Sequence, residues 1–178
     1  MNKEFWNVLF EKEEWVCFAP TLRATKAYQL KTKTKRDTEF FSINPLEPNT
    51  TRLAKNVSSF RNFLVEMDGD DENNLISLED QERIVERSGL PWTTKLFTGN
   101  KSMHYIVSLE TGLDDQMQYD MYFKAIAEIL RRTANELGIK GGIDEKCKDP
   151  GRMSRTPEGM RMLPFKALHE LKEVKERV

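Results

Sequence analysis

Three acidic residues end an apolar run at residues 60–70, and their spacing could support metal chemistry. The apolar residues surround an acid without a helical period, which predicts a buried strand that ends in charge. Because side chains alternate along a strand, Glu66 and Asp68 point to the same face, and Asp70 extends the row if the strand continues. Carboxylates at this spacing repel one another unless a cation lies between them, and Mg²⁺ or Mn²⁺ takes such oxygen ligands. The alternative is an acidic turn, with Gly69 and the residues after it forming a solvated loop.

A histidine and a lysine belong to a predicted β-hairpin. Its strands are expected at residues 93–98 and 102–109, joined by a two-residue turn at Gly99-Asn100. A single histidine on a strand is more often structural than catalytic. Here His104 shares a face with Ser102 and follows Lys101, an arrangement that suits binding of phosphate oxygens. The sequence therefore predicts an anion site, although the GxxxxGK[ST] pattern of a Walker A loop is absent.

A third acid and two arginines occur later in the chain. Residues 141–144 are predicted to form a short apolar strand that ends at Asp144. Arg152 and Arg155 follow in a segment framed by proline and glycine, which suits phosphate or carboxylate recognition better than scattered charge does. The alternative for these arginines is a surface loop with ordinary salt bridges.

The elements that must position these residues include both helices and strands. Helices are predicted at residues 3–11, 77–87 and 115–137, and further strands at residues 15–19 and 39–44. Ser77, with an acid three residues later, is expected to cap the second helix, which ends at Gly89. The charged tail at residues 168–178 is predicted to be helical.

Composition bounds the class of protein. The chain has 178 residues and a net charge of −1, which fits one domain without a global basic excess. Residues 22–36 nevertheless carry six basic residues and no acid, and are a candidate for phosphate contact. Cys17 and Cys147 lie far apart, which favours reduced thiols and an intracellular, cytoplasmic protein. No export signal, membrane span or Cys/His zinc site is expected.

In this order, the motifs resemble those of the archaeo-eukaryotic primases, in particular the primase–polymerases of phages and plasmids. The carboxylate motif of that family resembles FLVEMD, and its small-residue-x-His motif resembles GNKSMH. Its third acid and basic loop resemble GGID followed by DPGRMSRTPEG. The resemblance covers residues 39–165.

The resemblance implies an α+β fold with the active site in a cleft. An RRM-like antiparallel sheet, at residues 61–165, would pack with a smaller N-terminal α/β unit at residues 1–60. Together with the tail at residues 166–178, which would begin a further region, these parts would form one catalytic domain over residues 1–178.

The resemblance also implies a metal site that holds Mg²⁺ or Mn²⁺. Glu66 and Asp68 would bind the ions, and Asp144 would complete the carboxylate set. The first acid is a glutamate where the family has aspartate, and Asp68 with Asp70 is a second possible pair.

The remaining motif residues would bind the incoming nucleotide. Ser102 and His104 would contact the triphosphate of an NTP or dNTP. The cationic residues Lys101, Arg152 and Arg155 would neutralise phosphate charge.

The function expected from this resemblance is template-dependent DNA priming and polymerisation on single-stranded DNA. A replicative helicase domain or another C-terminal region is an expected partner, and no membrane is involved. The main alternative is a non-catalytic, RRM-like module that binds single-stranded nucleic acid. A nicking enzyme ranks last, because His104 and His169 are not neighbours.

Overall fold

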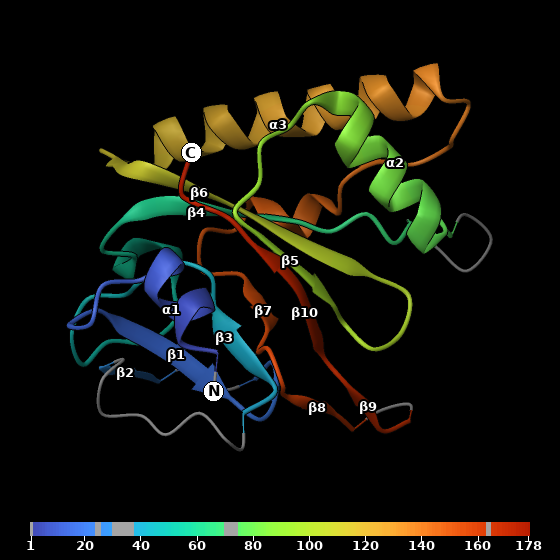
Figure 1. The fold of residues 1–178 in the computed structure, drawn as a ribbon. Coiled ribbons are helices and arrows are strands. Elements are labelled where there is room, and N and C mark those ends of the chain that lie inside the picture. The colour runs from blue at the N-terminus through green and yellow to red at the C-terminus, as the bar shows by residue number, and fades with distance from the viewer. Residues whose placement is uncertain (1, 24–25, 30–37, 70–74, 163–164) are drawn as a thin grey trace.

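The computed structural model describes residues 2–23, 26–29, 38–69, 75–162 and 165–178. It contains two four-stranded sheets, a two-stranded ribbon and three α-helices (Figure 1). Asp70, which could have extended the acidic row, lies outside the described residues, as does most of the basic segment at residues 22–36.

The N-terminal sheet has the strand order β2-β1-β3-β7, and all its pairs are antiparallel. Its strands are β1 (Trp15–Ala19), β2 (Ala27–Gln29), β3 (Phe40–Ser42) and β7 (Met153–Arg155). Helix α1 (Lys3–Leu9) packs on this sheet, where the rings of Phe5 and Trp6 meet Phe41 edge-on with centroids 5.6 and 5.0 Å away. This apolar helical face agrees with the spacing in the sequence. The N-terminal sheet therefore includes a strand, β7, from late in the chain.

The second sheet has the order β10-β5-β6-β4 and is also antiparallel. Its strands are β4 (Phe60–Val65), β5 (Thr94–Phe97), β6 (Met103–Leu113) and β10 (Glu170–Val174). Helices α2 (Leu78–Ser88) and α3 (Gln116–Glu136) cover one face (Figure 1), and Phe63 stacks on Tyr119 of α3 at 4.3 Å. The two helices leave the other face of the sheet directed toward the N-terminal unit.

Helix α2 has the predicted boundaries. The Ser77 side chain accepts a hydrogen bond from the Asp80 amide, and the helix ends at Gly89 with a φ of 68°. Glycine adopts this left-handed conformation at little cost. Both ends therefore follow from local chemistry.

Short elements complete the fold. They are the 3₁₀ helices η2 (Ala54–Asn56) and η3 (Glu145–Lys148) and a ribbon of β8 (Met160–Arg161) with β9 (Ala167–Leu168). The two-residue turn predicted for the hairpin is wrong: Phe97 pairs with Met103, and the intervening loop has five residues, 98–102. Both the amide and the hydroxyl of Thr98 donate to the Ser102 carbonyl, which closes this loop.

The helix predicted for the C-terminal tail is wrong, because these residues form the edge strand β10. Leu171 and Val174, spaced as on a helix, both pack against the core. A register shift between Leu171 and Glu173 brings them to one side of the strand. A bulged strand thus satisfies the same apolar spacing that indicated a helix.

Candidate active site

The acids that follow β4 lie beside the first residues of β6. Val65 pairs with Tyr105, so the same register places Glu66 opposite His104 and Asp68 opposite Ser102. The His104 Nε2 lies 3.2 Å from Glu66 Oε1. The Ser102 hydroxyl donates to Asp68 Oδ2 at 3.3 Å. The alternation of side chains predicted from the sequence therefore places two cross-strand contacts, Glu66 with His104 and Asp68 with Ser102, on one face of the sheet.

Asp144 joins Glu66 from a different element than the one predicted. It does not end a strand but caps η3, where its side chain accepts from the Lys146 amide at 2.9 Å. Its own amide donates to the Glu66 carbonyl at 2.8 Å. One ligand atom each from Glu66, Asp144 and Cys147 lie within 4.8 Å of one another. Asp68 is outside this set.

Two cations compensate the acids. The Arg152 Nη2 lies 3.1 Å from Asp144 Oδ2 and 3.8 Å from Glu66 Oε2. The Lys101 Nζ lies 3.0 Å from Asp68 Oδ2. Each of the three predicted metal ligands therefore has a cationic neighbour.

The loop that carries Lys101 is held by a buried glutamine on α2. The Gln81 side chain donates to the Lys101 carbonyl at 2.8 Å and accepts from the Met103 amide at 2.9 Å. Its amide also donates to the Ile76 carbonyl. Helix α2 thereby fixes the backbone on both sides of Ser102.

Glu66 is held in its ionised form. Burial raises the pKa of its carboxyl, but the charge that the His104 ring carries in its protonated form, the hydrogen bond from this ring, and the contributions of Arg152 and Ser102 outweigh burial and lower the pKa from 4.5 to about 2. A carboxylate in this state is ready to bind a cation at neutral pH.

His104 also contacts the N-terminal sheet. Its Nδ1 lies 2.9 Å from the hydroxyl of Ser154 on β7, and both side chains are buried. The sequence reasoning missed Ser154, because no local pattern shows that β7 faces β6. The imidazole is therefore held from both sheets.

Arg155 is not brought to this cluster. Alternation along β7 turns it away from Ser154, and it forms an ion pair with Glu39 while lying 4.2 Å from the centroid of the Phe40 ring. Burial, with a contribution from the charge of Arg161, lowers the pKa of Arg155 to about 10. Its expected role in neutralising phosphates stays a prediction.

The donor set suits a hard divalent ion. Glu66 and Asp144 supply carboxylate oxygens, which Mg²⁺ and Mn²⁺ prefer, and Asp68 lies two residues from Glu66. Burial, followed by the charge of Glu66, raises the pKa of Cys147 well above its usual value. Because Mg²⁺ and Mn²⁺ prefer oxygen to sulfur ligands, the carboxylate oxygens would hold the ion.

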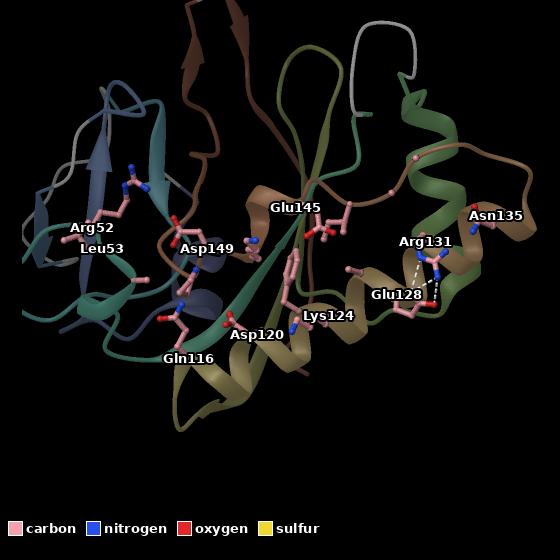
Figure 2. A pocket seen from close by; sticks show the side chains of 18 residues that line it. Arg52, Leu53, Gln116, Asp120, Lys124, Glu128, Arg131, Asn135, Glu145 and Asp149 are labelled. Atoms are coloured by element: carbon pink, nitrogen blue, oxygen red, sulfur yellow. Dashed lines mark hydrogen bonds and ion pairs between the residues drawn. The ribbon is translucent and has the colours of Figure 1, made fainter.

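A wide groove of about 1280 Å³ lies apart from these residues. Figure 2 shows α3 residues such as Asp120, Lys124 and Glu128 facing it on one side. The 141–150 segment and Arg52 line the rest. Basic and acidic side chains are equally frequent in its lining, and none of the predicted site residues takes part. The charges in the lining of the groove therefore show no basic excess, and the candidate site residues lie in the cluster around Glu66 instead.

Among the described residues, no helix has the length and apolar character needed to cross a bilayer.

No protein-family model and no curated protein sequence matches this chain. Two solved structures are similar to it. The first is the AEP domain of a primase–polymerase from cyanophage S-2L, with a TM-score of 0.63 and 14% identity over 97% of this chain and 88% of that chain. The second is the polymerase domain of ligase D from Mycobacterium tuberculosis in complex with DNA, with a TM-score of 0.50 and 11% identity over 76% of this chain and 50% of that chain. Both are archaeo-eukaryotic primase-type domains. The chain therefore has the mixed α+β fold of the archaeo-eukaryotic primase domains.

Proposed function

We propose that this chain is the catalytic domain of a primase–polymerase from a phage or plasmid replication protein, acting on a single-stranded DNA template. The observation that carries the proposal is the meeting of Glu66 and Asp144 within 4.8 Å beside His104. The similar domains, one named as a primase–polymerase and one as a polymerase domain with DNA, support the same class of reaction. A C-terminal region with a helicase remains a proposed partner.

Glu66, Asp144 and Asp68 would hold Mg²⁺ or Mn²⁺. An ion bound there would activate the 3′-hydroxyl of the growing strand and neutralise charge on the phosphates of an NTP or dNTP. The 3′-oxygen attacks the α-phosphorus, and the bond to the pyrophosphate oxygen breaks.

The protein side chains position the triphosphate. Ser102 and His104, which contact Asp68 and Glu66 in this structure, would donate hydrogen bonds to phosphate oxygens, and Lys101 would bring a positive charge beside them. Arg152, which now contacts two carboxylates, would turn to the phosphates once an ion binds those acids. These donors would stabilise the charge on the leaving pyrophosphate.

The test is nucleotide incorporation on a single-stranded DNA template, with and without a primer, in Mg²⁺ and in Mn²⁺. Asp144→Asn should abolish the labelled product, because asparagine can still cap η3 but is a much weaker metal ligand. Glu145→Gln is the matched control, since Glu145 is the next residue and faces the groove (Figure 2). Equal activity of Asp144→Asn and the wild type would refute the proposal.

One observation favours the non-catalytic alternative: the three acids already have cationic neighbours without any metal. A binding module would hold single-stranded DNA equally well in EDTA and in Mg²⁺. It would also give no product in any lane and would bind DNA unchanged in Asp144→Asn.

A further inference from the structure

We propose that Ser154 is a positioning residue that holds His104 with its Nε2–H directed at the anion in the site. The inference deepens the proposed function, on which it rests: the anion would be a phosphate oxygen of the bound nucleoside triphosphate. It assigns a role to a serine that lies between the two arginines of the basic loop.

The contacts of His104 define where its proton lies. Its Nε2 faces the Glu66 carboxylate at 3.2 Å, and a carboxylate can only accept a hydrogen bond. The Nε2 atom must therefore carry a hydrogen. In a neutral ring this leaves Nδ1 as the acceptor, so the Ser154 hydroxyl, at 2.9 Å, donates to it.

The burial of Ser154 strengthens this arrangement. The side chain is 1% exposed, and among the described residues its hydroxyl has no contact other than His104. If Nδ1 carried the hydrogen instead, the serine O–H would be left buried without an acceptor. Such an unpaired group would disfavour the reversed tautomer by about tenfold or more.

The anchor is independent of the metal site. Ser154 lies on β7, at the edge of the N-terminal sheet, whereas Glu66 follows β4 of the other sheet. When the Glu66 carboxylate turns to a divalent ion, Ser154 still holds the far side of the ring. The freed Nε2–H is then directed at whichever anion accompanies the ion.

The chain contains an internal reference for the test. It has two histidines, and the second, His169, places Nδ1 at 2.9 Å from the Thr156 carbonyl. A carbonyl only accepts, so His169 must carry its hydrogen on Nδ1, and its buried Nε2 has no partner among the described residues. The two histidines should therefore be opposite tautomers.

The first arm of the test uses long-range proton–nitrogen correlation spectra of the ¹⁵N-labelled, nucleotide-free protein, at a pH where both rings are neutral. We expect His104 as the Nε2–H form and His169 as the Nδ1–H form, with His104 unchanged in Glu66→Gln. In Ser154→Ala the His104 Nδ1 resonance should move, as a hydrogen bond to it is lost. Two results would overturn the proposal. One is an Nδ1–H form of His104 in wild type or in Glu66→Gln, and the other is an Nδ1 resonance of His104 that does not move in Ser154→Ala.

The second arm measures the affinity for a fluorescent, non-hydrolysable nucleoside triphosphate in Mn²⁺. Ser154→Ala should weaken binding by about fivefold to tenfold. Ser154→Thr, which keeps a hydroxyl, should restore most of the affinity. In the His104→Ala background, Ser154→Ala should change affinity by less than about twofold, because Ser154 acts through the ring.

Ser42→Ala is the matched control. Ser42 is a fully buried serine on the neighbouring strand β3, and its hydroxyl contacts the Cys17 amide and the Asn44 carbonyl instead. An equal loss of affinity in Ser42→Ala, or additive losses in the His104 background, would refute the positioning role. If the protein binds no nucleotide, the proposed function fails, while the spectra of the nucleotide-free protein still decide the assignment of Ser154.

Discussion

Removal of Arg152 should raise the affinity for divalent metal while lowering the affinity for nucleotide. The guanidinium contacts Asp144 at 3.1 Å and Glu66 at 3.8 Å, so an entering ion must replace it. A charge pair at such a distance is worth about 4 kcal/mol at an effective dielectric constant of about 20. The Arg152 side chain is 29% exposed, which reduces the expected effect to about 1 kcal/mol, or about fivefold in the dissociation constant.

The assay is a titration with Mn²⁺ in which the free ion is followed by electron paramagnetic resonance. Arg152→Ala should bind Mn²⁺ about fivefold more tightly than wild type. Lys148→Ala removes the same charge from η3 on the side that faces the groove, and should change the affinity much less. A second titration with nucleotide at saturating Mn²⁺ should show weaker binding for Arg152→Ala.

Two outcomes would refute this reasoning. Weaker Mn²⁺ binding in Arg152→Ala would mean that the arginine supports the metal ligands rather than competing for them. An equal increase in Mn²⁺ affinity in Arg152→Ala and Lys148→Ala would mean that only the overall charge of the region affects metal binding.

Two further predictions concern stability. Asn44→Ala should lower the free energy of unfolding by about 3 kcal/mol, measured by urea denaturation, since its buried side chain donates to the Asn62 and Pro150 carbonyls and accepts from the Arg61 and Asn62 amides. The control is Asn56→Ala, because Asn56 is only partly buried and its side chain donates a single hydrogen bond, to the Thr51 carbonyl. Similar losses of stability in both variants would contradict this explanation. The pKa of Glu66 is lowered to about 2 in the folded state, so the ionised carboxylate contributes at most about 3 kcal/mol to the free energy of unfolding. This stabilisation is fully present above pH 4.5 and is lost as the pH falls toward 2. When the free energy of unfolding is measured in EDTA at decreasing pH, it should therefore fall less steeply for Glu66→Gln than for wild type. The same dependence on pH in both proteins would show that the neighbours of Glu66 do not hold it ionised.

The sequence predicted the face of the site better than its contacts. The two-residue period places Glu66 with Asp68 and Ser102 with His104, since alternation is a local property of a strand. That these pairs meet depends on the register between β4 and β6, which no local pattern contains. The motif order, read as a family resemblance, indicated the fold that the structural comparisons confirm.

Long-range packing explains the remaining differences. Arg152 and Arg155 look equivalent in the sequence, but pairing of β7 with β3 turns Arg155 toward Glu39. Ser154 lies between them, and nothing in the local sequence indicates a role for a serine there. Its contact with His104 depends on the folding of β7 beside β6. Leu171 and Val174 have the spacing of a helix, but a strand with a single bulge also brings them to one side. The strand forms because β10 can pair with the edge of β5, which the local sequence does not show.

The most direct test of the central claim is the position of Mn²⁺ in crystals grown with a non-hydrolysable nucleoside triphosphate. We expect an anomalous peak beside the carboxylates of Glu66 and Asp144, with Arg152 turned to the phosphates. A peak elsewhere, or an Arg152 that still bridges the two carboxylates in the presence of saturating Mn²⁺ and nucleotide, would contradict it.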